Sequence, residues 1–334
     1  LLAKWLKSNT SSKRTKRLYR KTRYHFNMSS EQYRKTVSRL RQKLNIVETS
    51  MSAKKWGEIE YAKVPSKASK NYARAFIRND GNRYRKYLKN VKTGKAKINA
   101  SAIFPYEILR SALRDPMNID TYESQWQSLP DYCSADEKSI CVCDTSGSMH
   151  GLPILVAVSL SIYMAERNLG PFKDHFITFS EKPTLQKIVG SNLVDKYHNL
   201  KKASWDMNTN IEEVFRLILK TAVNHKVPRD EMFHKIYIIS DMEFDECTYN
   251  RNATNFENAK QMFERMGYTL PQLVFWNVDS RHDQSPIVIG DQCVYLVSGC
   301  SPSLFRSLMS TSSFDAYSFM LEVLNSERYS CVRI

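Results

Sequence analysis

Residues 140–151, ICVCDTSGSMHG, decide the fold of the second part of this chain. The apolar run Ile140–Cys143 reads as a buried strand, and an aspartate, two serines two residues apart and a glycine follow it at once. A second apolar stretch, from Leu152, has the length and composition of a core helix. Parallel α/β sheets are built from strands that pass through a short loop into a helix. The segment therefore predicts a βα unit whose loop carries one carboxylate and two hydroxyls.

The same alternation continues to the end of the chain. Strands are expected at 140–143, 175–179, 235–239, 273–277 and 293–297, helices at 152–168, 211–224, 255–266, 303–309 and 314–324, and a short antiparallel edge strand at 185–189. Alternating strands and helices give right-handed crossovers and a parallel sheet covered on both faces. We therefore expect a Rossmann-like α/β domain over residues 135–334.

Residues 1–134 lack strand patterns and read as an all-helical domain. Ser29 and Gln32 have the spacing of a capping box at the start of an amphipathic helix. Ser66 and Asp80 are expected to cap two successive helices, and Pro105 to open another. The sequence thus predicts two domains that meet at 134/135.

The first part of the chain is strongly basic. Residues 1–110 contain 29 Lys and Arg against 6 Asp and Glu, whereas the whole chain of 334 residues has a net charge of +16. Near the N-terminus, aromatic residues are interleaved with six cations, namely Arg14, Lys16, Arg17, Arg20, Lys21 and Arg23. Such a pattern favours binding of RNA or another polyanion. A solvated surface, an acidic protein or a membrane surface are the alternatives.

The seven cysteines are odd in number and lack the spacing of a disulfide framework, which favours free thiols in a reducing compartment. No apolar run is long enough to span a bilayer, and the chain opens with Lys4 and Lys7 and no apolar h-region, so we expect no signal peptide. We expect an intracellular, cytoplasmic protein, or a virion component if the source is a giant virus. Because the chain opens on Leu1 rather than methionine, we also expect the helical domain to be truncated at its N-terminus.

Oxygen-bearing side chains recur where strands end or helices begin. In an open parallel sheet, the carboxyl ends of the strands meet the following loops in one crevice. Two carboxylates and three hydroxyls are ligands for Mg²⁺ or Mn²⁺ rather than zinc. Because the two carboxylates supply only two negative charges, an open coordination position on the ion should attract a carboxylate or phosphate oxygen from a partner. An acidic protein ligand is the expected partner. The predicted metal ligands are Asp144, Ser146, Ser148, Thr209 and Asp241.

The order Asp-x-Ser-x-Ser, Thr and Asp resembles the metal-ion-dependent adhesion site of von Willebrand factor A domains at all five positions, a likeness that covers about residues 136–334. Across nearly the whole chain, stretches such as SRLRQKLNIVETSMSAKKW, KINASAIFPYEI and ISDMEFD resemble an uncharacterised intracellular and giant-virus family. That family joins a helical region to an A domain and is similar to the Ro (TROVE) ribonucleoproteins, whose helical ring binds RNA. The resemblance implies an interaction protein and no known reaction.

A metal-dependent phosphoester hydrolase or nuclease using the same site is the competing interpretation. As a phosphatase nucleophile, Asp144 lacks the usual second aspartate, because Ser146 stands two residues on. No G-x-S-x-G elbow or phosphate-binding P-loop motif occurs. Glu243 and Asp245 supply spare acids, so the hydrolase stays open. We expect a non-enzymatic protein.

Overall fold

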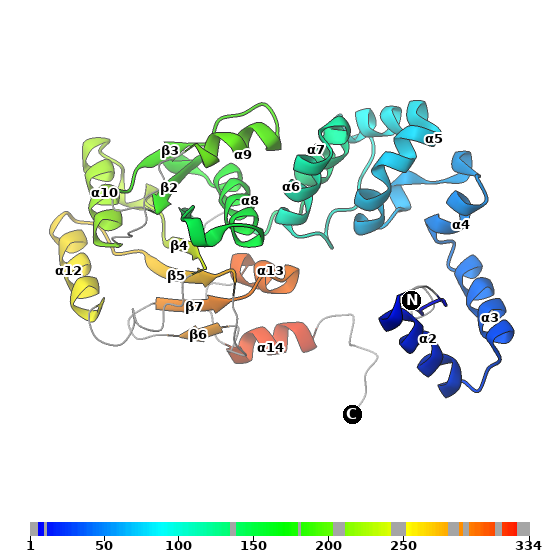
Figure 1. The fold of residues 1–334 in the computed structure, drawn as a ribbon. Helices are drawn as coiled ribbons and strands as arrows, with labels where there is room; N and C mark the ends of the chain where they lie inside the picture. Colours follow the sequence, from blue (N-terminus) through cyan, green and yellow to red (C-terminus); the bar gives the residue numbers. More distant parts are fainter. Residues whose placement is uncertain are drawn as a thin grey trace. The chain divides into compact units, whose positions relative to one another are not determined.

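The computed structural model describes residues 6–9, 12–133, 138–179, 182–202, 211–241, 252–279, 287–289, 294–310 and 316–325. The chain forms two compact units, Leu1–Asn99 and Ala100–Ile334 (Figure 1). In the described part of the chain, no helix combines the length and apolar content needed to cross a membrane.

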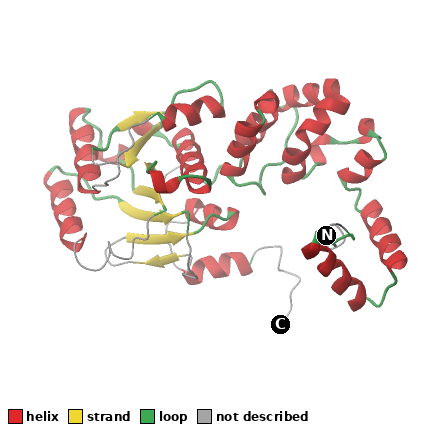
Figure 2. Ribbon diagram, in the orientation of Figure 1, coloured by secondary structure: helices red, strands yellow, loops and turns green. Residues whose placement is uncertain are grey.

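The first unit consists of helices joined by short turns. Its α-helices are α2 (Lys13–His25), α3 (Ser30–Lys43), α4 (Val47–Ser52) and α5 (Ser66–Lys92), and its 3₁₀ turns are η1 (Trp56–Glu58) and η2 (Tyr61–Lys63). No strand lies among the residues described here, as Figure 2 shows by the absence of yellow. The expected helical character of this region is therefore confirmed.

Local capping chemistry sets several of these helix ends. The capping box before α3 is confirmed, since Gln32 N donates to Ser29 Oγ at 3.1 Å and Ser29 N donates to Gln32 Oε1 at 2.8 Å. The two helices expected from Ser66 and Asp80 instead form α5, which is kinked where Asp80 leaves helical geometry (φ −149°, ψ 40°). Pro65, not Ser66, occupies the N-cap position of α5.

The Asp80 side chain explains the kink. Its Oδ2 accepts hydrogen bonds from Tyr61 OH at 2.6 Å and Arg83 Nε at 2.7 Å. The Arg83 guanidinium also lies 4.7 Å from the Tyr61 ring centroid and donates to the Ile59 carbonyl at 2.9 Å. Burial, and then the hydrogen bond to Asp80, raise the pKa of Tyr61 above its usual value. Asp80 therefore bonds to Tyr61 outside the helix and to Arg83 within it, and these contacts hold the bend.

A seven-stranded sheet forms the centre of the second unit, in the order β3-β2-β1-β4-β5-β7-β6. The neighbours from β2 to β7 are parallel, and β3 and β6 are antiparallel edges. All the expected strands are present, whereas β6 was not anticipated. The strands are β1 (Ser139–Asp144), β2 (His175–Phe179), β3 (Leu185–Lys187), β4 (Lys235–Ser240), β5 (Gln272–Asn277), β6 (Ile287–Ile289) and β7 (Val294–Ser298).

Helices cover both faces of this sheet (Figure 1). Side chains alternate along β1, so Cys141 and Cys143 join the core formed with α8, whereas Ile140 and Val142 join the core formed with α10 and α12. This confirms the expected Rossmann-like fold of the von Willebrand factor A type. The helices are α6 (Pro105–Arg114), α7 (Ile119–Gln127), α8 (Leu152–Arg167), α9 (Leu193–Lys201), α10 (Ile211–Asn224), α12 (Asn252–Arg265), α13 (Pro302–Ser310) and α14 (Ala316–Leu324).

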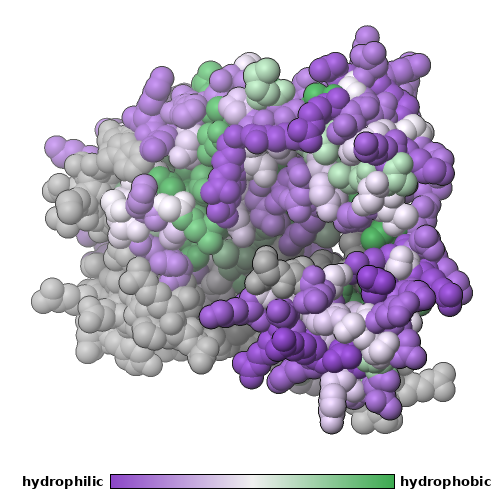
Figure 3. All heavy atoms as spheres, turned by 45° about the vertical axis from the view of Figure 1, so that its right-hand side comes forward, coloured by the Kyte–Doolittle hydropathy of each residue, from purple (hydrophilic) through white to green (hydrophobic). Residues whose placement is uncertain are grey.

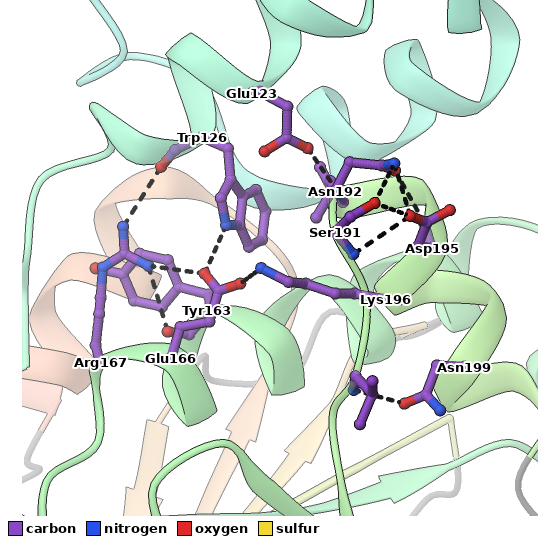
Figure 4. Close-up of polar contacts among 12 residues, drawn as sticks. Glu123, Trp126, Tyr163, Glu166, Arg167, Ser191, Asn192, Asp195, Lys196 and Asn199 are labelled. Carbon is purple, nitrogen blue, oxygen red and sulfur yellow. Dashed lines mark hydrogen bonds and ion pairs between the residues drawn. The ribbon is translucent and has the colours of Figure 1, made fainter. Parts of the chain in front are cut away.

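Helices α6 and α7 belong to this second unit by their packing. Ile108 and Leu109 of α6 are fully buried in the same core as α8. Figure 4 shows Trp126 of α7 donating from Nε1 to Glu166 Oε2 of α8 at 2.8 Å, while Lys196 Nζ of α9 donates to Glu166 Oε1 at 2.6 Å. The compact units thus divide at Asn99/Ala100, earlier than the boundary expected at 134/135, because α6 and α7 cover an apolar helix of the α/β unit.

Candidate metal centre and nucleic-acid interface

The predicted metal ligands come from two adjacent parallel strands. Strand β1 ends at Asp144, and Asp241 directly follows β4. The strands pair in parallel up to Cys143 opposite Ile239, so their carboxyl ends lie at the same edge of the sheet. After β1, a 3₁₀ turn (η4, Gly147–Met149) leads into α8. This geometry brings the Asp-x-Ser-x-Ser loop beside the end of β4.

Hydrogen bonds connect four of the five predicted ligands. Asp144 Oδ1 accepts from Ser146 N at 2.8 Å, and the hydroxyls of Ser146 and Ser148 lie 3.0 Å apart. Ser148 Oγ donates to Asp241 Oδ1 at 3.0 Å. Four oxygen-bearing residues thus form one hydrogen-bonded set from the carboxylate of Asp144 on β1 to that of Asp241 after β4, in which the first link is made by the Ser146 backbone N–H.

Burial and donor type suit a hard divalent cation at this site. Asp144 is 1% exposed, whereas Ser148 is exposed, so the set runs from the sheet edge to the surface. All the side-chain donors are oxygens, which Mg²⁺ prefers. Within the described ranges, no group of three or more His, Cys, Asp or Glu side chains could hold a metal.

One residue in contact with the set was missing from the sequence prediction. Ser240, the last residue of β4, is buried and donates from Oγ to Asp144 Oδ2. Its position just before Asp241 is the one signal in the sequence, and the contact with Asp144 also requires the register of β1 against β4. Thr209, the fifth predicted ligand, lies outside the described residues. His150, in the same loop, is exposed.

The two cysteines of β1, Cys141 and Cys143, precede Asp144 on the strand and are buried in the core instead of joining the polar set. Burial raises the pKa of the Cys143 thiol to about 12 and raises that of Cys141 as well. Both side chains are buried in the α8 core. Since the thiolate is the form that attacks electrophiles and binds metals, these thiols are suited to packing rather than to catalysis. Both are free, as expected from the sequence.

The six predicted nucleic-acid contacts all lie on α2. Five of them are exposed on that helix: Arg14, Lys16, Arg17, Arg20 and Lys21. The sixth, Arg23, is half-buried and donates from Nη1 to the Met28 carbonyl at 3.1 Å. The exposed five are therefore available to phosphates, whereas Arg23 supports the turn after α2.

The aromatic residues of α2 and its C-terminal end also include both buried and exposed side chains. Tyr19 is buried and packs edge-on against Tyr33, with ring centroids 5.2 Å apart. Tyr24 is 86% exposed, and Phe26 is exposed beside it. Figure 3 brings the side of the helical elements forward and shows hydrophilic residues over most of that face. Tyr24 and Phe26 could stack on bases, but Tyr19 could not.

Comparison with known proteins gives the family. Residues 138–330 match "Domain of unknown function (DUF7788)", which is more than half of the chain. The chain belongs to the DUF7788 family. Residues 2–136 match a second family, "Domain of unknown function (DUF2828)". The two matches meet at 136/138, so the DUF7788 match begins just before β1 and leaves α6 and α7 outside it.

Two similar proteins are also longer than this DUF7788 chain. "Uncharacterized protein L728" of Acanthamoeba polyphaga mimivirus is 33% identical over 319 residues, covering 90% of this chain and 56% of its own length. The solved Ro (RSR) protein of Deinococcus radiodurans is 12% identical with a TM-score of 0.43, covering 72% of this chain and 51% of its own. The chain thus spans little more than half the length of each. The giant-virus relative confirms the family resemblance expected from the sequence.

Proposed function

We propose that this chain is a non-enzymatic interaction protein whose α/β unit binds Mg²⁺ (or Mn²⁺) and thereby captures an acidic protein ligand. The observation that carries the proposal is the chain of hydrogen bonds from Asp144 to the Ser146 backbone N–H, between the Ser146 and Ser148 hydroxyls, and from Ser148 to Asp241. In this proposal these four side chains hold the ion together with Thr209. Ser240 keeps the Asp144 carboxylate oriented through its hydrogen bond to Oδ2.

The charge of the donor set favours capture of an anionic partner. Two carboxylates balance a divalent cation, and hydroxyl ligands add no further negative charge. A bound ion would therefore supply a Lewis-acidic position for a carboxylate oxygen of another protein. Because Ser148 is exposed and Asp241 is half-buried, such an oxygen can approach from solvent.

The same donor set argues against phosphoester hydrolysis. Two-metal phosphoryl chemistry needs enough carboxylates to hold both ions. In the described residues, the set contains two carboxylates, Asp144 and Asp241, and its other members are hydroxyls. His150 is exposed beside the loop, and no described contact links it to a serine hydroxyl as a catalytic base would require.

The helical unit supplies the second half of the proposal, which is binding of RNA or another polyanion. Five exposed cations of α2 and the exposed Tyr24 support it. Phosphate contacts from Lys and Arg together with stacking on aromatic faces are the means by which proteins hold single strands. The excess of positive charge over residues 1–110 gives this region the long-range attraction that such binding uses.

A pull-down with and without EDTA tests the metal-dependent half. The 334-residue chain immobilised in Mg²⁺ should retain an acidic protein that EDTA releases, and the Asp144→Asn variant should not retain it. An Asp230→Asn variant serves as the control, because Asp230 is an exposed carboxylate on the turn η6 (Arg229–Glu231). Equal retention by wild type, Asp144→Asn and EDTA-treated protein would refute the proposal.

A further inference from the structure

Polar residues continue across the sheet from the candidate metal ligands toward β7. Ser240, which donates to Asp144 Oδ2, is the register partner of Asn277 at the end of β5, and Asn277 is the register partner of Ser298 at the end of β7. Register partners on neighbouring strands project from the same face of a sheet. Four adjacent strands therefore end in one polar row (Figure 1), which we name the strand-end row: Asp144, Ser240, Asn277 and Ser298.

The row lies where the apolar packing of this face ends. Leu273 and Phe275 of β5 share the face of Asn277 and are buried in the core formed with α10 and α12. Ser240 is fully buried, and Asn277 is only 6% exposed. Burying an amide or a hydroxyl costs free energy unless its hydrogen bonds are made. The polar members of the row therefore need hydrogen-bond partners.

The hydrogen bonds of Asn277 account for one end of its side-chain amide. Its Oδ1 accepts from Asp279 N at 3.0 Å, which closes the turn after β5. The amide also carries two N–H donors on Nδ2. In the part of the chain that the structure describes, no residue accepts a hydrogen bond from this nitrogen. Since buried polar groups are normally hydrogen-bonded, these donors call for a partner outside the described residues.

The next residue of the row has the same property. Ser298 is half-buried, and none of the contacts among the described residues uses its hydroxyl. Backbone pairing continues past the strand ends, because Val278 N donates to the Ser240 carbonyl at 3.0 Å and Gly299 N donates to the Asn277 carbonyl at 2.9 Å. Asn277 and Ser298 thus stand on paired backbone and carry donors that the described fold does not use.

We infer that Asn277 and Ser298 bind peptide carbonyl oxygens of the acidic protein ligand whose carboxylate the metal centre captures. The inference rests on the proposed metal-dependent function and adds the part of the ligand that lies beside its acidic side chain. Amide and hydroxyl donors suit neutral carbonyl oxygens, and a peptide presents one at every residue. The strand-end row thereby distinguishes an acidic residue within a chain from a free carboxylate.

The spacing of the strands fits this assignment. Neighbouring strands lie about 4.7–4.9 Å apart, so Asn277 and Ser298 lie about 5 and 10 Å from β4 along the row. An extended peptide advances about 3.3–3.6 Å per residue. A ligand whose acidic side chain reaches Asp144 and Asp241 therefore brings its own carbonyl, or those of the next two residues, past Asn277 and Ser298.

The charge beyond the row argues against a second carboxylate as the group bound there. Asp279 follows Asn277 by two residues and is half-buried. Its carboxylate lies near Cys300, because burial and then the charge of Asp279 raise the pKa of that thiol. Cys300 follows Ser298 by two residues, so this negative charge lies at the β7 end of the row. It repels a second carboxylate or a phosphate but not a peptide carbonyl.

Two small probes and an isosteric variant test the inference on the 334-residue chain loaded with Mn²⁺. Acetate supplies a carboxylate alone, whereas N-acetyl-aspartate N-methylamide supplies a carboxylate with a peptide group on either side. Asn277→Asp keeps an acceptor for Asp279 N but loses the Nδ2 donors. Asn224→Asp, at the exposed last position of α10, controls for the added charge. Titration calorimetry measures each affinity, and circular dichroism shows whether each variant is folded.

The ratio of the two affinities is the quantity to compare, because both probes carry the same charge and an added carboxylate affects both. Wild type and Asn224→Asp should prefer the aspartate derivative by about three- to tenfold, the strength of a typical net hydrogen bond. Asn277→Asp should bind both probes alike. Ser298→Ala should reduce the preference about twofold or more, and it decides the question if Asn277→Asp does not fold.

The outcomes separate this inference from the proposed function. If wild type binds Mn²⁺ and both probes without a preference, the assignment is overturned and the metal-dependent proposal stands. The same follows if folded Asn277→Asp keeps the wild-type preference, or if Asn277→Asp is unfolded and Ser298→Ala keeps it. If wild type binds no Mn²⁺, or binds the ion but neither probe, both proposals are overturned.

Discussion

Ser148 donates a 3.0 Å hydrogen bond to Asp241, 93 residues further along the chain. The bond joins the loop after β1 to the first residue after β4, and it exists because these strands are parallel neighbours. A capping role for either residue would be satisfied locally, within a few residues of sequence. The contact instead gathers carboxylate and hydroxyl oxygens from two loops at one point. In the function proposed above, these oxygens are the ligands of a divalent cation.

The first prediction concerns the metal. Asp144→Asn keeps the size of the side chain, and its amide oxygen can still accept from Ser146 N, but the negative charge is lost. Mn²⁺ affinity, measured by titration calorimetry, should fall at least about 100-fold, since even residues that only orient metal ligands contribute 10–100-fold. Ser240→Ala, which removes the hydrogen bond to Asp144 Oδ2, should cost about 10-fold. Asp230→Asn should bind like wild type.

The second prediction is an absence of turnover. With Mg²⁺ or Mn²⁺ present, the full chain should leave nucleotides, phosphoesters and RNA intact, because the described donor set has two carboxylates. The measurement is product formation over hours with repurified protein. A rate that survives repurification and is lost in Asp241→Ala would replace the interaction role with a hydrolase.

Much of this architecture could be predicted from the sequence because local signals and burial agree. Most strands and helices of the α/β unit follow from apolar runs of matching length, whereas β6 and α9 were not predicted. The packing of α6 and α7 could not be predicted in this way. The apolar face of α6, including Ile108 and Leu109, shows that the helix is buried but not which unit covers it. That choice depends on tertiary contacts such as Trp126 with Glu166.

The candidate site shows the same division between local and tertiary information. Asp144, Ser146 and Ser148 are close in sequence, and Asp241 follows from the rule that strand ends converge. Ser240 was missed because its role depends on the register of β1 against β4. On α2, the six cations were predicted as one group, but the Arg23 side chain turns back to the Met28 carbonyl, a contact that composition does not reveal.

The third prediction follows from the packing of α6 and α7. A fragment of residues 100–334 should unfold at a higher temperature than one of residues 138–334, which corresponds to the DUF7788 match without those helices. Removing α6 would expose apolar residues of α8 that share its core, and each large buried side chain lost typically costs about 2–5 kcal/mol. Thermal circular dichroism measures the difference. Equal melting temperatures would mean that α6 and α7 add no stability to the sheet.

The fourth prediction concerns the buried thiols. Burial raises the pKa of Cys143 to about 12, so the folded protein should keep it protonated at pH 8. Iodoacetamide should label the half-buried Cys133 well before Cys141 and Cys143, as read by peptide mass spectrometry, and urea should abolish the difference. Because the pKa is raised on folding, its contribution to stability is complete below the unfolded value of about 8.5 and is lost as pH rises toward 12. Rapid native labelling of Cys143 would contradict this burial.

The fifth prediction concerns α2. Each phosphate neutralised on a single strand lowers the logarithm of affinity by about 0.7 per unit of the logarithm of salt concentration. Changing the five exposed cations of α2 to Gln should therefore flatten the salt slope for single-stranded RNA by about three to four if all five contact phosphates. Arg23 is kept, because its hydrogen bond to the Met28 carbonyl supports the turn that leads to α3.

Tyr24→Ala should weaken RNA binding by about 1–3 kcal/mol with the salt slope unchanged, since stacking releases no counterions. EDTA should alter neither value, because the cations and the candidate metal ligands belong to different units. A slope that is the same in wild type and the five-site variant would show that α2 is a solvated surface, and a loss on chelation would place the polyanion at the metal centre.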